Sequence, residues 1–313
     1  MSKLERPDYL WFNGKICPWN EGNVHVWSEV ATRGANVFEG IRCYTQQNGS
    51  RSILSLDAHM DRLYDSAKLL HFTPGFSKEE MIHGIHQIIR KIPKGEHVYI
   101  RPTIYVEYGR YGKLYGDDEY GAYVVAFPTP RGESVTKGVT CCISTWKHSN
   151  DLIISPRIKA GASYQAYRLP VIEARSKQFD EAILLNQEDY VTETTGAAVF
   201  IVKGNKLITP PLSAGILDSI TRKHVMEIAK KRLDMEVLEE NITRIDLYLA
   251  NEAFAVGTLA EITPIVKIDL HELSNGKPGR YTKKIQEIYF DICEGRIEDK
   301  WNWLVPVEEL EEN

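Results

Sequence analysis

The sequence predicts a two-domain protein of the α/β or α+β class, and three observations support this. The chain of 313 residues is too long for one small hydrophobic core. Strand patterns and amphipathic helix patterns occur in both halves of the chain. Residues 128–138 (PTPRGESVTKG) are rich in Pro, Gly and charge, which is typical of an interdomain linker. We therefore expect a smaller N-terminal α/β domain over residues 1–127 and a larger C-terminal domain over residues 139–313.

Turn and cap signals mark the elements of the first half. Asn13-Gly14 is a strong hairpin signal between two short strands. Asp57 is the expected N-cap of an amphipathic helix over residues 58–70. Residues 77–80 (SKEE) begin a second helix with a capping pattern. The other expected elements are strands at residues 10–12, 15–16, 52–56, 98–106 and 120–127, and a turn or short helix at 38–40 that continues as a strand to 44.

Beyond the linker, short strands alternate with helices and no internal repeat is found. The expected strands cover residues 139–146, 181–186, 198–203 and 206–208, and the expected helices cover residues 162–177, 219–232 and 280–294.

Composition excludes several classes of protein. The net charge of −5 is spread along the chain without a polybasic run, so we expect no nucleic-acid partner. The five cysteines contain no C-x-x-C pair, which suits unreacted thiols in a reducing compartment. No apolar stretch has the length of a membrane helix or of a signal-peptide core. We expect a soluble, cytoplasmic protein that has no metal site.

Four segments carry residues that suit a carbonyl cofactor with a phosphate group. The first is PRIKAGASY (156–164), which places Lys159 between small residues, after a strand and before a helix. Such a position can keep the amine in a cleft, and imine formation requires a neutral amine at an enclosed site. Taken alone, Lys159 would be interpreted as a surface lysine.

The second segment, YVTETTGAAVF (190–200), places Glu193 among threonines in a half-buried, β-rich stretch. A buried carboxylate is costly unless it is paired, and a protonated pyridine nitrogen would be a suitable partner. An exposed loop glutamate is the alternative for this segment.

The third and fourth segments suit an anion. Asp218-Ser219 caps a helix whose first-turn amides, together with the Thr221 hydroxyl, favour a phosphate, although any capped helix presents the same amides. Gly257 and Thr258 lie in a predicted loop where backbone amides can approach an anion closely.

In this order and spacing, the four segments resemble those of the fold-type IV pyridoxal-phosphate enzymes, and most closely those of the branched-chain amino acid aminotransferases. The resemblance runs nearly end to end. Its motifs are VFEGIRCY (37–44), HMDRLYDSAK (59–68), YIRP (99–102), IKAG..Y (158–164), the Glu193 segment, ITR (220–222), GT.AEITP (257–264) and EDKWNWL (298–304). The resemblance implies an active site between the two domains and at least a homodimer.

The resemblance also implies roles toward pyridoxal 5′-phosphate. Lys159 would carry the cofactor as a Schiff base and move the proton between the substrate α-carbon and C4′. Tyr164 would hydrogen-bond the phenolate oxygen, and Glu193 would pair with the pyridine nitrogen. The other implied contacts are Arg62, the Ile220 backbone, Thr221 and Thr258 to the phosphate, and Leu217 against the ring.

The implied substrate contacts match an apolar and aromatic pocket. Phe38 and Tyr99 fit this pattern, and Tyr99 with the amides of Thr258 and Leu259 is expected to take a carboxylate. Arg101 would take the distal carboxylate of glutamate, because a guanidinium binds a carboxylate through two parallel hydrogen bonds. The implied reaction is reversible amino-group transfer between a branched-chain L-amino acid and 2-oxoglutarate.

Three departures from the family pattern concern the substrate. Arg33 stands where these enzymes usually have a tyrosine, and a further guanidinium would favour acidic substrates or alter how glutamate is held. Gly196 lies in residues 194–198 (TTGAA), which replace the usual G-A-G-E-N, and residues 108–115 (YGRYGKLY) are richer in Tyr and cations than usual. In the alternative for Arg33, the side chain turns outward and pairs with Glu29.

The departures leave other reactions open. An (R)-amine or D-amino acid transaminase would keep the cofactor and change the substrate. Aminodeoxychorismate lyase would keep the fold and change the reaction. A pyridoxal-binding protein without catalysis would be expected to lack Lys159, which is present.

Overall fold

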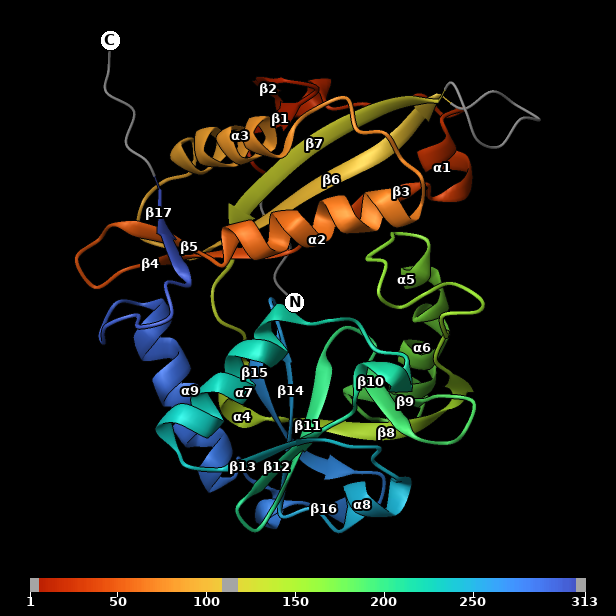
Figure 1. The fold of residues 1–313 in the computed structure, drawn as a ribbon, viewed down its shortest axis with the longest axis vertical. Helices are drawn as coiled ribbons and strands as arrows, with labels where there is room; N and C mark the ends of the chain where they lie inside the picture. Colours follow the sequence, from red (N-terminus) through yellow and green to blue (C-terminus); the bar gives the residue numbers. More distant parts are fainter. Residues whose placement is uncertain (1–5, 109–117, 308–313) are drawn as a thin grey trace. The chain divides into compact units, whose positions relative to one another are not determined.

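The computed structural model describes residues 6–108 and 118–307. The chain divides into two compact units, which are described separately (Figure 1). Unit 1 comprises Met1–Pro130, Ile158–Ala162 and Ile292–Asn313, and unit 2 comprises Arg131–Arg157 and Ser163–Asp291. The change of unit after Pro130 falls within the expected linker. Unit 2 does not continue to residue 313, because the segments 158–162 and 292–313 belong to unit 1.

Unit 1 is built on an eight-stranded sheet. Its strands are β1 (Tyr9–Phe12), β2 (Lys15–Pro18), β3 (Asn36–Phe38), β4 (Ile41–Thr45), β5 (Arg51–Leu54), β6 (Val98–Tyr108), β7 (Glu119–Pro128) and β17 (Leu304–Pro306). The strand order is β17-β5-β4-β6-β7-β1-β2, and β3 pairs with β6. The helical segments are η1 (Trp19–Glu21), α1 (Glu29–Arg33), α2 (Leu56–Leu69) and α3 (Lys78–Arg90). Buried Met60 and Leu63 of α2 and Ile85 of α3 join the apolar core of the sheet.

Local signals predicted several of these elements correctly. Asn13 and Gly14 have positive φ angles of 45° and 92°, as a two-residue hairpin turn between β1 and β2 requires. The predicted capping pattern of α3 is confirmed, because the Ser77 side chain accepts from the Glu80 amide and the Glu80 side chain accepts from the Ser77 amide.

Two local predictions in unit 1 are wrong. Helix α2 begins at Leu56, and its N-cap is Ser55 rather than Asp57. Asp57 lies in the first turn, where a carboxylate is favourable toward the helix dipole and does not mark the helix boundary. The residues between β3 and β4 form no helical turn.

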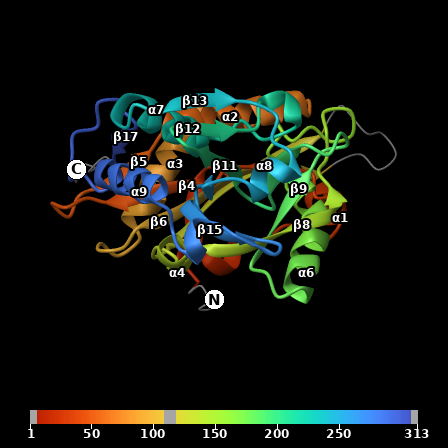
Figure 2. The ribbon, with the colours of Figure 1, turned by 90° about the horizontal axis from the view of Figure 1, so that it is seen from below.

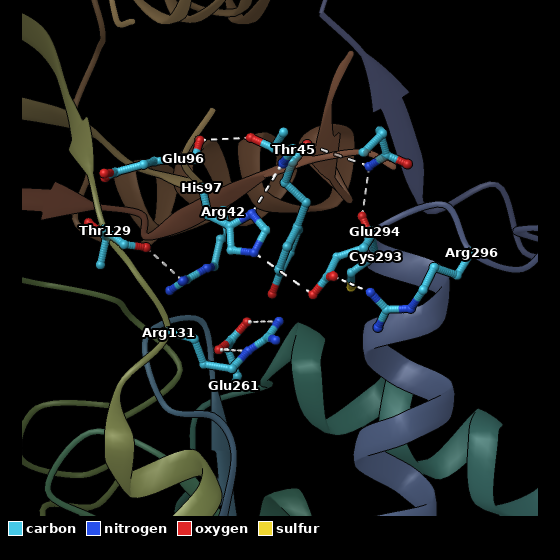
Figure 3. Close-up of polar contacts among 12 residues, drawn as sticks. Arg42, Thr45, Glu96, His97, Thr129, Arg131, Glu261, Cys293, Glu294 and Arg296 are labelled. Atoms are coloured by element: carbon cyan, nitrogen blue, oxygen red, sulfur yellow. Dashed lines mark hydrogen bonds and ion pairs between the residues drawn. The ribbon is translucent and has the colours of Figure 1, made fainter. Parts of the chain in front are cut away.

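The C-terminal part of the chain completes unit 1. β17 pairs with β5 in antiparallel register, from Leu304↔Leu54 to Pro306↔Ser52. Polar contacts hold the preceding segment to the residue after β4 and to the residue before β6 (Figure 3). Nε2 of Gln46 donates to the Cys293 carbonyl over 2.7 Å, and Nε2 of His97 lies 3.8 Å from a carboxylate oxygen of Glu294. The Thr45 amide donates to Nδ1 of His97 over 3.2 Å, which leaves Nε2 as the protonated nitrogen that faces Glu294.

Unit 2 is built on a nine-stranded sheet that closes on itself. Its strands are β8 (Val139–Lys147), β9 (Glu181–Leu185), β10 (Val191–Thr194), β11 (Ala198–Lys203), β12 (Lys206–Thr209), β13 (Glu236–Glu239), β14 (Glu252–Gly257), β15 (Glu261–Ile268) and β16 (His271–Glu272). The order β10-β9-β8-β15-β14-β11 returns to β10 through the pair Glu193↔Ala198. β12 and β13 extend the sheet from β11, and the side chains inside it form a second apolar core.

The helices of unit 2 lie around this sheet (Figure 2). They are α4 (Glu133–Lys137), α5 (Ser163–Ala166), α6 (Arg168–Ser176), η2 (Leu212–Ala214), α7 (Ile220–Arg232), α8 (Arg244–Tyr248), η3 (Ser274–Gly276) and α9 (Arg280–Cys293), the last of which runs into unit 1. Helix α6 packs against β8 and β9.

Two predictions for this half, one of a helix and one of the linker, need correction. The helix expected over residues 162–177 is divided at Tyr167 into α5 and α6. Pro170 lies in the first turn of α6 and has no N–H to bond to the Ala166 carbonyl, so one continuous helix cannot form. The expected linker also contains α4, a short helix.

In the described ranges, 6–108 and 118–307, no helix has both the length and the apolar composition needed to cross a membrane.

Candidate active site

Lys159 lies in an irregular segment that is held against β3 and α2 within unit 1. The Phe38 amide donates to the Lys159 carbonyl over 3.0 Å, and the Lys159 amide donates to Oγ of buried Ser66 over 3.2 Å. The Gly161 amide donates to the Asn36 carbonyl over 3.0 Å. A Cβ on Gly161 would collide with the Asn36 side chain, so a larger residue there would force Asn36 to move. The backbone on both sides of the lysine is therefore fixed. The segment precedes α5 as expected, but it follows a loop rather than a strand.

A buried ionic cluster orients Arg62. The Glu39 side chain is fully buried, and Arg62 donates to it through Nε over 2.6 Å and through a terminal nitrogen over 2.8 Å. Nδ1 of His59 lies 2.7 Å from the same carboxylate. Burial alone would raise the pKa of Glu39, but Arg62 and His59 hold it far below its usual range. Burial lowers the pKa of His59 despite the Glu39 charge. A neutral His59 that donates from Nδ1 therefore stabilises an ionised Glu39.

Phe38, Tyr99 and Arg101 lie together on β3 and β6. The guanidinium carbon of Arg101 is 3.6 Å from the centroid of the Phe38 ring, and Nζ of Lys159 is 5.2 Å from it. Tyr99 is buried and packs against Phe127. A Cβ on Gly40 would meet the Tyr99 hydroxyl at 2.7 Å. Of the predicted substrate residues, Phe38 and Arg101 thus lie with Lys159, and Tyr99 lies two positions from Arg101 on the same strand.

Arg33 ends the short helix α1 and forms an ion pair with Glu29, one helical turn earlier. The Arg33 side chain is 46% exposed, while that of Glu29 is 12% exposed. This is the pairing that the alternative for Arg33 predicts. Ser28 caps α1 by accepting from the Ala31 amide.

In unit 2, Glu193 lies on β10 and is buried, as its surroundings in the sequence predict. The Leu217 amide donates to Oε2 of Glu193 over 3.2 Å. Nε2 of His148 lies 3.6 Å from the same oxygen. Leu217 and Glu193, which are 24 positions apart in the sequence, are therefore neighbours.

The first turn of α7 presents amides that suit an anion. Oγ of Ser219 accepts from the Arg222 amide over 3.2 Å, which confirms the predicted cap. The amides of Ile220 and Thr221 have no acceptor within the helix, because the first-turn donors of any α-helix lack one. Arg222, the third residue of the ITR motif, is buried and donates to Oγ1 of Thr209 over 3.0 Å. It also pairs with Glu239, so it holds this helix end to β12 and β13.

Thr258 and Leu259 lie in the turn between β14 and β15. Arg131 donates to the fully buried carboxylate of Glu261 over 2.9 and 3.3 Å, and its guanidinium lies 3.6 Å from the Phe290 ring centroid (Figure 3). Glu261 directly follows the turn and has a φ of 47°, so this pair fixes the end of the turn that carries the predicted amides.

The remaining predicted residues of unit 2 are partly accessible. Tyr164 in α5 is 39% exposed, and its ring packs edge-on against Tyr167 at 5.4 Å. Gly196 is exposed in the turn between β10 and β11, and its amide donates to Oγ1 of Thr194. The loop at 108–115, which departs from the family pattern, lies almost wholly outside the described residues.

Comparison with known proteins shows the family. The amino-transferase class IV model matches residues 36–268. The chain is 37% identical over 309 residues to the branched-chain-amino-acid aminotransferase of Salmonella typhimurium, with 97% of this chain and 98% of the relative covered. The chain belongs to the class IV aminotransferases, and it is a pyridoxal-phosphate-dependent enzyme.

Solved structures support the same family. The PLP form of the branched-chain amino acid aminotransferase from Thermobaculum terrenum matches with a TM-score of 0.92 and 37% identity, over 97% of this chain and all of the other. The branched-chain aminotransferase from Thermoproteus uzoniensis with norvaline matches with a TM-score of 0.89 and 36% identity, over 96% of this chain and 99% of the other.

The residues of this chain fit the cofactor chemically. A lysine with a fixed backbone suits the carbonyl, and the helix N-terminus at Ile220 suits the phosphate. The buried Glu193 carboxylate suits a protonated ring nitrogen. Glu39 and His59 were missed as functional residues, although both lie inside motifs that were recognised. Their pairing joins the residue after β3 to α2, and no local pattern predicts such a contact.

Proposed function

We propose that this enzyme transfers amino groups reversibly between a branched-chain L-amino acid and 2-oxoglutarate. The observation that carries the proposal is the stacking of Arg101 on Phe38 next to Lys159. Phe38 offers an apolar surface for a branched side chain, and Arg101 offers a planar cation for the distal carboxylate of glutamate. One group of residues thus suits both substrates.

Each residue has a task in the proposed reaction. Bound pyridoxal phosphate supplies an electron sink for the charge that develops at the substrate α-carbon. The Lys159 amine would remove the α-proton of the substrate and return it to C4′ of the cofactor. Glu193 keeps the ring nitrogen protonated, and Tyr164 donates to the phenolate oxygen. Tyr99 and the turn amides of Thr258 and Leu259 orient the substrate carboxylate, while Gly196 leaves room beside it.

We assign the phosphate to the residues that the resemblance implies. The Ile220 amide, Thr221 and Thr258 supply donors, while Leu217 packs on the ring. Arg62 contributes charge. An arginine has five N–H donors, so its two bonds to Glu39 are compatible with a phosphate contact.

We further propose that the enzyme works in the cytoplasm as a homodimer or a larger homo-oligomer. All five cysteines are buried free thiols, which suits a reducing compartment. Unit 2 also exposes large apolar side chains on the end of β8, the loop after it and α6. These are Trp146, Leu152, Ile153, Ile154, Leu169 and Ile172. Exposed apolar side chains on neighbouring segments suit an interface, and a second copy of the chain is the occupant we propose.

A half-reaction screen tests the substrate class. The purified enzyme is mixed separately with L-leucine, L-glutamate, D-alanine and (R)-1-phenylethylamine while the cofactor spectrum is followed. We expect L-leucine and L-glutamate to convert the spectrum rapidly and the other two to leave it nearly unchanged. Faster conversion by D-alanine or the (R)-amine would contradict the proposal.

Arg33 forms an ion pair with Glu29, and the hypothesis to be tested is that the same guanidinium also assists Arg101 in holding the distal carboxylate. Arg33→Tyr should then raise KM for 2-oxoglutarate about 10-fold, the lower end of what a charge-assisted hydrogen bond contributes, and leave kcat/KM for leucine unchanged. Glu29→Gln is the matched variant, because it breaks the ion pair and keeps the guanidinium. Equal changes for both substrates in Arg33→Tyr would show that Arg33 serves only the pair with Glu29.

A further inference from the structure

A buried histidine and a tyrosine lie beside the Glu193 carboxylate within unit 2, and no role assigned above uses them. Nε2 of His148 is 3.6 Å from Oε2 of Glu193 and 3.2 Å from the Tyr167 hydroxyl. The His148 and Tyr167 rings stack, with centroids 5.5 Å apart and 27° between their planes. The His148 side chain is fully buried.

Fixed backbone contacts determine which nitrogen of His148 carries the proton. Nδ1 lies 3.0 Å from the Ser149 carbonyl oxygen. A carbonyl oxygen can only accept, so Nδ1 is the donating, protonated nitrogen. The His148 amide donates to the Leu185 carbonyl over 2.9 Å, and the His148 carbonyl accepts from Nε2 of Gln187 over 3.0 Å. These two contacts fix the backbone of His148. The Nδ1 contact and the stacked Tyr167 ring restrict how the imidazole can turn.

Tyr167 determines the state of the other nitrogen. Burial raises the pKa of Tyr167, and the nearby Glu193 and Tyr164 raise it further, so the hydroxyl keeps its proton. The hydroxyl can therefore donate to Nε2 of His148, which accepts with its lone pair. While this bond exists, Nε2 has no proton to donate to Glu193.

We propose that Tyr167 and His148 are positioning residues that reserve the negative charge of Glu193 for the pyridine nitrogen of the cofactor. This inference rests on the role proposed for Glu193. If the Tyr167 hydroxyl is removed, Nε2 has no donor to accept from, and a proton held on Nε2 can be donated in a hydrogen bond to Oε2 of Glu193. The resulting ion pair competes with the pyridine nitrogen for one carboxylate and weakens protonation of the ring.

Kinetics of single and double variants test the pair. Tyr167→Phe should lower kcat with leucine about 10-fold, the lower end of what a charge-assisted hydrogen bond contributes, while KM stays unchanged. Adding His148→Phe removes the competing donor, so the double variant should be faster than Tyr167→Phe alone. A purely structural role predicts a double variant that is no faster than Tyr167→Phe alone, because removing a second buried side chain would not repair the loss of the first. Tyr248→Phe is the matched control; it removes a hydroxyl that donates to Asp269 in the same unit and should leave kcat unchanged.

Nitrogen NMR of His148 in the cofactor-free protein gives a readout that does not depend on turnover. At neutral pH the wild type should carry a proton on Nδ1 and none on Nε2, whereas Tyr167→Phe should carry protons on both. A wild-type Nε2 that is protonated, or a double variant no faster than the single one, overturns the inference. Failure of the wild type to react with any amino donor would contradict the proposed function instead, and the NMR result would still decide the state of His148.

Discussion

Lys159→Ala should keep the fold and lose transamination by several orders of magnitude. The variant loses the amine that binds the cofactor carbonyl and the group that moves the proton, so two contributions disappear together. The backbone contacts of residue 159 run through its amide and carbonyl, and alanine retains both. Circular dichroism checks the fold, and single-turnover spectra with leucine measure the loss.

Labelling locates the modified lysine independently. Borohydride reduction of the wild type should abolish the visible band and leave the cofactor attached to Lys159 in a peptide digest. Lys137→Ala is a suitable control, because Lys137 lies on the surface and pairs with Glu133. Near-normal turnover of Lys159→Ala would remove the basis of the mechanism.

Glu193→Gln should reduce kcat on the order of 10²–10⁴-fold and change cofactor affinity far less. Glutamine preserves size and can still accept from the Leu217 amide, but it has no charge to keep the ring nitrogen protonated. The phosphate contacts proposed at α7 do not involve Glu193, so the cofactor should remain bound. Turnover and cofactor dissociation are measured on the same preparation.

A control separates loss of charge at Glu193 from loss of charge in general. Glu236→Gln removes a surface carboxylate that pairs with Lys206 in the same unit. It should leave kcat and cofactor affinity unchanged. If Glu193→Gln released the cofactor but kept normal turnover per bound cofactor, the role assigned to Glu193 would be wrong.

Local chemistry explains which elements could be predicted. The turn at Asn13-Gly14 and the cap at Ser77 depend on residues within four positions of each other, so the sequence displays them directly. The start of α2 could not be predicted, because Ser55 adopts a left-handed conformation with a φ of 51° that no side-chain preference indicates.

In the candidate site, too, only residues that local sequence identifies could be predicted. Motifs identified Lys159 and Glu193 because each lies in a recognisable segment. The surroundings of Glu193 could not be predicted in the same way. His148 follows the end of β8 and carries no motif, and it meets Glu193 only because β8, β9 and β10 are adjacent in the closed sheet.

The pairing of β17 with β5 has a consequence for the order of events during synthesis. A chain made from its N-terminus contains β5 long before residues 304–306, and the whole of unit 2 is made in between. Until residues 304–306 emerge, β5 remains an edge strand with unpaired backbone groups, which is the kind of edge that aggregates. The nascent N-terminal half therefore depends on residues 304–306 to cover β5, and ribosome-bound fragments that stop before residue 304 should be prone to self-association.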